Sequence, residues 1–349
     1  MRTDVIMTAL SVWFVLGLFL DAYYHANFTD QETFFTPWHA VFYSGFAATG
    51  GWVLWTVWGH VRLGRRGLAA VPVGYGMTMI ALPVFAVSGA ADLAWHELLG
   101  IETTTDIFFS PSHLGLITAM IVILTSPLRS AWGDPELPAQ PPLRQLLPAV
   151  VTLAFAASLV MLFLTYGNSL VYDAYDVVGS FSDLYYGDAD VLAARMVITT
   201  VVLLAPLLLL ARRWSLPRGA ATLTYATVAL VSSMLTGFDN PEILLAAVAA
   251  GFVIDVLAAW LRPSAQRRGA YWAFGLTAPF VTSVLYIGAA SYAAGLPAVT
   301  EIWTGAPIVM ALVGWALAAL MLPNSITSGP IRGGPMSSKP IAERADVHS

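Results

Sequence analysis

The sequence predicts an all-α fold: a polytopic transmembrane helical bundle of about ten spans. The 349 residues are 58% hydrophobic and only 11% charged, against roughly 25% charged in an average soluble protein, and the mean hydropathy is +0.72. Apolar runs of about twenty residues, long enough to cross a bilayer, recur along the chain. The alternating pattern of a membrane β-barrel is absent, so the spans are expected to be helices, which satisfy their own backbone hydrogen bonds in lipid.

Each expected span is one of these apolar runs. In chain order they cover residues 4–25, 37–60, 72–96, 112–128, 144–165, 190–211, 219–237, 241–261, 270–292 and 303–322. The segment 166–189 between two spans is rich in Tyr and Asp, and it is long enough for a short helix or a re-entrant piece. The tail 323–349 is rich in Gly, Ser and Pro, a composition typical of disorder.

The basic residues predict the orientation of the spans. Of the 16 Lys and Arg residues, all but Arg195 fall on one side of a ten-span topology when both termini are cytoplasmic. The chain is therefore expected in the cell inner or plasma membrane as a multi-pass protein. Its net charge of −5 comes from acidic outward loops, and we expect no nucleic-acid partner. Because Cys is absent, thiolate ligands and disulfides are excluded.

A sequence repeat joins the first four spans. The first copy reads "DAYYHANFTDQETFFTPWH", Asp21 to His39, and the second reads "DLAWHELLGIETTTDIFFSPSH", Asp92 to His113. Both contain Asp-x-x-x-His, an acidic loop, and Phe-Phe-[Thr/Ser]-Pro-x-His. We interpret this repeat as an internal duplication of a helical hairpin.

The spacing within each copy predicts a cluster of ligands. Asp and His four residues apart lie on one helix face, here in the last turn of an outgoing helix. Thr36-Pro37 and Ser110-Pro111 are typical of an N-cap followed by Pro at the first helical position. The sequence therefore predicts two Asp-His-His sites, and such sets suit first-row transition metals. They are Asp92, His96 and His113, and Asp21, His25 and His39.

Structural interpretations compete with a metal site. A single His or Asp near a helix end is usually a capping or snorkelling residue, and the cluster is also compatible with a hydrogen-bonded structural or proton-handling group. Two copies that use four of the six histidines favour metal, because ionisable groups in membrane helices are costly and usually functional. Imidazole and carboxylate suit copper, iron and zinc alike.

At these motifs the chain resembles the C subunit of the particulate methane and ammonia monooxygenases, the copper membrane monooxygenases. The resemblance covers about residues 21–120 and is carried by "DLAWH…DIFFSPSH" and "DAYYH…FFTPWH". It implies copper at Asp92, His96 and His113, and a second site at Asp21, His25 and His39. Here Asp21 stands where the family has Asn. The family's first unit is better matched by the second copy in this chain, the one that begins at Asp92. The spans beyond residue 130 show no likeness to the family.

The resulting expectation is a duplicated metal-binding region in 1–130, further helices in 144–322 and a cytoplasmic tail in 323–349. The resemblance implies a copper-dependent monooxygenase-like oxidoreductase, with O₂ and a small apolar substrate reaching an extracytoplasmic site from the lipid. One alternative is a metal-binding or delivery protein, or the metal-bearing subunit of a larger membrane complex or homo-oligomer. Another is a metal-dependent membrane hydrolase.

Overall fold

The computed structural model describes residues 2–28, 34–99, 107, 109–182 and 188–322, and within these ranges the chain forms helices and no β-strand. The elements are α1 (Arg2–Asn27), α2 (Pro37–Arg62), η1 (Gly67–Ala70), α3 (Gly76–Leu99), α4 (Pro111–Leu124), α5 (Ser126–Trp132), α6 (Leu143–Phe163), η3 (Thr165–Gly167), η4 (Ser169–Val171), α7 (Ala174–Ser180), α8 (Asp188–Arg213), α9 (Ala220–Leu235), α10 (Pro241–Leu261), α11 (Arg268–Ala294) and α12 (Thr300–Met321). The all-α prediction is confirmed for the described residues.

A helix occupies each of the ten ranges expected from the sequence. Within the described residues, eight helical segments are long and apolar enough to cross a membrane: α1, α3, α4 together with α5, α6, α8, α10, α11 and α12. The helix α9 is shorter, with 16 residues, and α2 is not among the eight although it has 26 residues. The structure therefore describes a multi-pass membrane protein with eight clear span candidates.

The fourth expected span is bent where α4 gives way to α5. Pro127 has no N–H to donate to the carbonyl one turn earlier, which breaks the helical hydrogen-bond ladder. The Ser126 hydroxyl takes that place by donating to the Ile123 carbonyl at 2.7 Å. The Arg129 guanidinium donates to the neighbouring Val122 carbonyl at 2.8 Å. Side-chain donors thus satisfy the carbonyls that the bend exposes.

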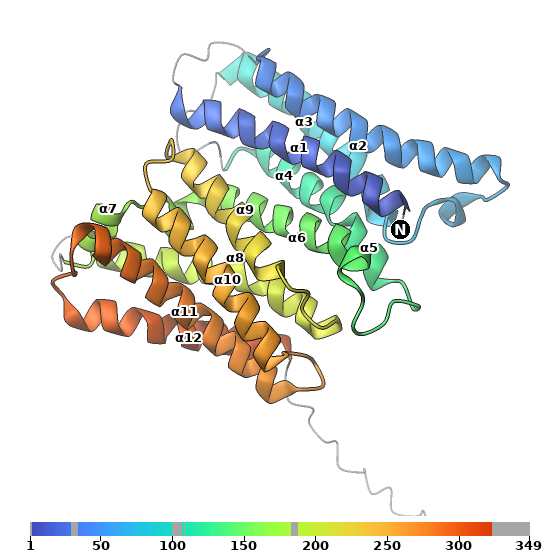
Figure 1. Cartoon of the computed structure of the whole chain (residues 1–349). Helices are drawn as coiled ribbons and strands as arrows, with labels where there is room; N and C mark the ends of the chain where they lie inside the picture. Colours follow the sequence, from blue (N-terminus) through green and yellow to red (C-terminus); the bar gives the residue numbers. More distant parts are fainter. Residues whose placement is uncertain (1, 29–33, 100–106, 108, 183–187, 323–349) are drawn as a thin grey trace, which may run out of the picture.

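The helices form antiparallel neighbours, with α1–α4 along one side of the molecule and α10–α12 along the other (Figure 1). The chain reverses between α1 and α2 and between α3 and α4, so both junctions lie at the same end of the bundle. The helices α6, α8 and α9 lie between the two sides (Figure 1). This arrangement brings the two predicted ligand groups to one end of the four N-terminal helices.

The core beneath that end is aromatic and closely packed. A Cβ added to Gly17 would lie 2.7 Å from the Phe42 Cα, and one added to Gly45 would lie 2.6 Å from the Phe14 Cα. These glycines let α1 and α2 approach almost backbone to backbone. The ring of Phe85 from α3 packs on Phe14 at 5.3 Å and on Phe46 at 4.2 Å. The aromatic contacts join the first hairpin to the second.

The segment 166–189, expected to hold a short helix or a re-entrant piece, contains the short helix α7, whose first turn is capped by the Asp173 carboxylate accepting from the Asp176 N–H at 2.7 Å. The tail 323–349, predicted to be disordered, lies outside the described residues.

Candidate metal centre

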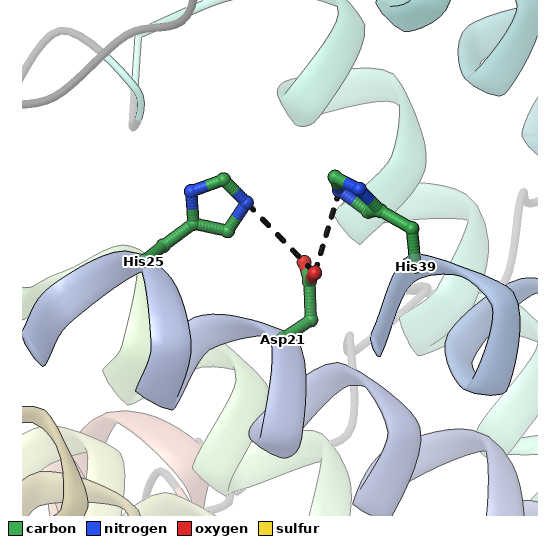
Figure 2. Close-up of side chains that lie close together, drawn as sticks. All are labelled: Asp21, His25 and His39. Atoms are coloured by element: carbon green, nitrogen blue, oxygen red, sulfur yellow. Dashed lines mark ion pairs between the residues drawn. The ribbon is translucent and has the colours of Figure 1, made fainter. Parts of the chain in front are cut away.

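The first Asp-His-His group forms where α1 ends and α2 begins. Asp21 and His25 lie in the last two turns of α1, and His39 lies in the first turn of α2. Asp21 Oδ1 is 3.8 Å from His25 Nε2 and 3.4 Å from His39 Nε2. Both imidazoles point toward the carboxylate, from either side (Figure 2).

The second group has the same construction at the junction of α3 and α4. Asp92 Oδ2 is 3.7 Å from His96 Nε2, and Asp92 Oδ1 is 3.3 Å from His113 Nε2. In each group, one ligand atom from each of the three residues can be chosen so that all lie within 4.8 Å of one another. The structure thus brings together all six residues that the sequence predicts, in two groups of three.

The start of α2 follows the predicted capping pattern. The Thr36 hydroxyl accepts from the His39 N–H at 3.2 Å, and Pro37 occupies the first helical turn. The start of α4 differs, because Ser110 occupies the N-cap position without a side-chain cap. Its hydroxyl instead pairs with the Ser112 hydroxyl at 2.9 Å. The expected side-chain cap is therefore present in the first copy, whereas in the second the serine joins a hydrogen-bonded chain.

The contacts of His39 indicate which of its two ring nitrogens carries the proton. The other nitrogen, Nε2, faces Asp21. Nδ1 lies 2.7 Å from the Phe34 carbonyl oxygen, an atom that can only accept. We therefore assign the proton of neutral His39 to Nδ1, which leaves the lone pair on Nε2. That lone pair faces the Asp21 carboxylate, so attraction between the two atoms requires a cation or a proton between them. An outer hydrogen bond that orients a ligating imidazole in this way is typical of metal sites.

The separations between donors fit a shared metal ion. Hydrogen bonds from nitrogen to oxygen are usually about 2.7–3.2 Å long, and the four Asp–His separations, at 3.3–3.8 Å, are longer. Two donors that each lie about 2.1 Å from one ion are between about 2.9 and 4.2 Å apart, depending on the angle at the metal. The Asp–His separations of both groups therefore fall within the range expected for ligands of one ion.

Charge and burial also favour a cation. Asp21 is 8% exposed and Asp92 is 2% exposed. If both buried carboxyl groups are ionised while the imidazoles are neutral, the two groups carry two uncompensated negative charges. Burying a charge without a partner is strongly unfavourable, and a metal ion in each group supplies the compensation.

The two carboxylates are held differently. Asp92 Oδ1 accepts a hydrogen bond from the Ser112 hydroxyl at 2.9 Å. The corresponding residue of the first copy is Trp38, which stacks on Tyr24 with ring centroids 3.7 Å apart. Asp21 Oδ1 accepts no hydrogen bond from the described residues. The second group therefore has an additional oriented ligand contact that the first lacks.

A small cavity lies between the two groups. Its volume is about 50 Å³, and it is lined by Leu18, Asp21, His39, Phe42, Tyr43, Asp92, His113, Leu116, Ile117, Met120 and Phe163. The ring of Phe34 stacks on His39 at 4.7 Å and also lies 5.8 Å from His96 of the other group. The two ligand groups thus share an apolar space and a common aromatic neighbour.

Other polar candidates have structural partners elsewhere. The Asp255 carboxylate accepts from the N–H groups of Ala221 and Thr222 at 3.1 and 2.9 Å, and so caps the start of α9 from α10. The Asn240 amide donates to the Leu170 carbonyl at 2.6 Å. His60 Nδ1 bonds the Ala70 carbonyl at 2.7 Å, at the opposite end of α2. None of these side chains lines the shared cavity.

Sequence reasoning missed Ser112, Phe34 and Tyr43 as neighbours of the ligands. Ser112 had a signal, since it occupies one of the two positions at which "SPSH" differs from "TPWH", and the other position only exchanges Ser for Thr. Comparison of the chain with known protein families, curated proteins and solved structures finds no match. The functional conclusions below therefore depend on the residues and their geometry.

Proposed function

We propose that this protein is an integral-membrane metalloprotein in which each Asp-His-His group binds one first-row transition metal ion, with copper as the preferred metal and iron or zinc as alternatives. The observation that carries the proposal is the orientation of His39, whose Nδ1 lies 2.7 Å from the Phe34 carbonyl oxygen while its Nε2 faces the Asp21 carboxylate at 3.4 Å. A hydrogen-bonded structural cluster would need a proton between each carboxyl group and its imidazoles, and shorter contacts than the observed 3.3–3.8 Å. The spacing and the buried negative charge both favour metal ions.

Contacts between equivalent residues support a duplicated hairpin. Asp21 and Asp92 are 71 positions apart, as are Asp4 and Tyr75, which are hydrogen-bonded to each other at 2.9 Å. In a twofold arrangement, only residues close to the axis can contact their own equivalents. This contact is expected if α1–α2 and α3–α4 are two copies packed about a pseudo-twofold axis, with one metal site each.

The shared cavity favours a reaction over storage or delivery of metal. Storage requires only the ligands, whereas here an apolar space adjoins both groups. Three protein ligands leave coordination positions open, as a catalytic metal requires. Bound copper would supply redox chemistry with O₂, and the apolar lining suits O₂ and a small apolar substrate that partition from lipid. We therefore propose a monooxygenase-like oxidoreductase that resembles the copper membrane monooxygenases.

We further propose ten spans, with both termini cytoplasmic and the metal centre on the extracytoplasmic side. In this topology, all but one of the basic residues obey the positive-inside rule. The helix α2 lies antiparallel to α1 and is equally long, which supports its inclusion as a span. A monooxygenase-like reaction also requires an electron donor, and we include further membrane subunits as partners in the proposal.

Metal analysis of the purified full-length protein tests the assignment. We expect two metal equivalents for the wild type and about one for His113→Ala or His39→Ala, with an EPR signal if the metal is Cu²⁺. His60→Ala is the matched control and should retain both equivalents. If folded His113→Ala keeps full occupancy, the second group is a structural cluster and its assignment as a metal site is wrong.

A further inference from the structure

Tyr43 is the one phenol that lines the cavity between the two ligand groups, among the residues that the structure describes. It lies on α2, one turn after His39, and its ring is 6.3 Å from the His39 ring. Its hydroxyl is buried and has no hydrogen-bond partner among the described residues. Buried hydroxyls in proteins nearly always have a partner, so one without a protein partner points to a ligand or water.

Gly89 makes the room in which this hydroxyl lies. A Cβ at position 89 would be 2.9 Å from Tyr43 Cε1 and 3.2 Å from the hydroxyl oxygen. Gly89 is on α3, one turn before the ligand Asp92. Any larger residue at position 89 would therefore displace the phenol from its place beside the second group.

The repeat shows that this polar feature is present on one side only. Counting from the ligand histidines, Tyr43 corresponds to Ile117 in the second copy, and counting from the aspartates, Gly89 corresponds to Leu18. Ile117 and Leu18 also line the cavity, as an apolar pair. Apart from the Asp and His residues of the two groups, Tyr43 is the one residue lining the cavity, among the described residues, whose side chain carries a hydrogen-bond donor.

We propose that the cavity between the two groups is a binding site for one ligand of two or three heavy atoms with a hydrogen-bond acceptor, and that Tyr43 is the positioning residue that donates to it. O₂ and a linear triatomic anion belong to this class. A volume of about 50 Å³ suits a ligand of this size, since an engineered cavity of about 150 Å³ binds benzene, which has six heavy atoms. The donor directs the acceptor atom to the side of the cavity formed by α2 and α3.

This inference rests on the proposed metal centre, because the ligand would be held by a metal ion at one end and by Tyr43 at the other. Azide is a suitable probe, since it binds Cu²⁺, has three atoms and accepts a hydrogen bond at its free end. The experiment uses the full chain loaded with Cu²⁺, and both metal content and azide affinity are measured on the same samples. Tyr43→Phe removes only the hydroxyl, and Tyr292→Phe is the control on a side chain that is 94% exposed on α11.

We expect Tyr43→Phe to keep the metal content and the azide-free EPR spectrum of the wild type while binding azide at least about tenfold more weakly, as expected for a hydrogen bond to a charged ligand. Gly89→Ala, which displaces the ring but retains the hydroxyl, should weaken azide in the same direction. Tyr292→Phe should bind azide like the wild type. Unchanged azide affinity in metal-loaded Tyr43→Phe would overturn the inference and leave the proposed metal centre intact. If the wild type binds no metal, the proposed function is wrong and this inference falls with it.

Discussion

The ring of Phe14 packs edge-on against the ring of Phe85, with centroids 5.3 Å apart and planes at 72°. Both side chains are completely buried. The two residues are 71 positions apart, the same offset that relates Asp21 to Asp92 in the repeat. Like the hydrogen bond between Asp4 and Tyr75, this is a contact between residues at equivalent positions of the two copies.

The two contacts lie at different levels along α1, with Tyr75 just before α3 and Phe85 within it. A pseudo-twofold axis of the proposed duplication would therefore run roughly along these helices. Asp21 and Asp92 are a third pair with the same offset of 71 positions. They lie nearer the C-terminal ends of α1 and α3, and both line the cavity. Such an axis makes each ligand group the near-equivalent of the other. Differences between the groups then come from the few positions at which the copies differ.

One such position is 112, and it predicts a difference in metal affinity. In a His39→Ala background, where only the second group remains complete, Ser112→Ala removes the hydroxyl that donates to Asp92 Oδ1. Loss of a hydrogen bond that orients a ligand typically weakens metal binding by about 10- to 100-fold. Competition with a chelator of known affinity measures the change.

The matched control is Ser44→Ala in the same background. The Ser44 hydroxyl donates to the Val41 carbonyl of its own helix and contacts no ligand. Its removal should leave metal affinity unchanged. Equal affinities for the two serine variants would mean that Ser112 does not orient the carboxylate.

A second prediction concerns the close approach of α1 and α2. Gly45→Ala places a Cβ 2.6 Å from the Phe14 Cα, which forces the helices apart. Overpacking of this kind typically costs about 1–3 kcal/mol. We expect a lower midpoint in thermal unfolding and reduced metal at Asp21, His25 and His39, whose geometry depends on this hairpin.

Gly51→Ala is the comparison on the same helix, because a Cβ there would have nothing within 4 Å. Alanine is the better helix former, by up to about 1 kcal/mol, so the thermal midpoint should hold or rise slightly. If Gly45→Ala proves as stable as Gly51→Ala, the tight backbone contact is not needed for the hairpin.

The third prediction is the sidedness of the metal centre. The chain has no Cys, so single cysteines at Glu32, Glu102 and Arg66 can be labelled selectively in intact cells. A membrane-impermeant maleimide should label positions 32 and 102, which lie between α1 and α2 and between α3 and α4, and should reach 66 only after lysis. Labelling of 66 from outside, or of neither 32 nor 102, would reverse the orientation.

The helices and the ligands were predictable because their signals are local. Apolar runs mark each helix, and Asp21 with His25 or Asp92 with His96 needs only the helical repeat to become neighbours. The start of α2 was equally predictable, since Thr36 at the N-cap followed by Pro37 at the first helical position is a local signal. Pro127 was also a visible signal for a bend, because proline interrupts a helix, although the fourth span was expected to be continuous.

Features that depend on packing between distant helices were not predictable in this way. The contact of Tyr43 with Gly89 requires knowing which faces of α2 and α3 meet. The role of Asp255 appears only when α10 lies beside the start of α9, 33 residues away in the chain from Thr222. In each case the partner residue is determined by how the helices pack, and the local sequence does not predict it.

Phe163, the last residue of α6, forms part of the cavity wall although it lies outside the repeat. Leu159 and Leu162 of the same helix, with Val231 and Met234 of α9, belong to the same buried cluster as Phe14 and Phe85. The four N-terminal helices therefore do not enclose the site by themselves. A fragment ending before α6 would open the cavity on that side, so the repeat is not a transferable module, and grafting it into another membrane protein would require a substitute for α6.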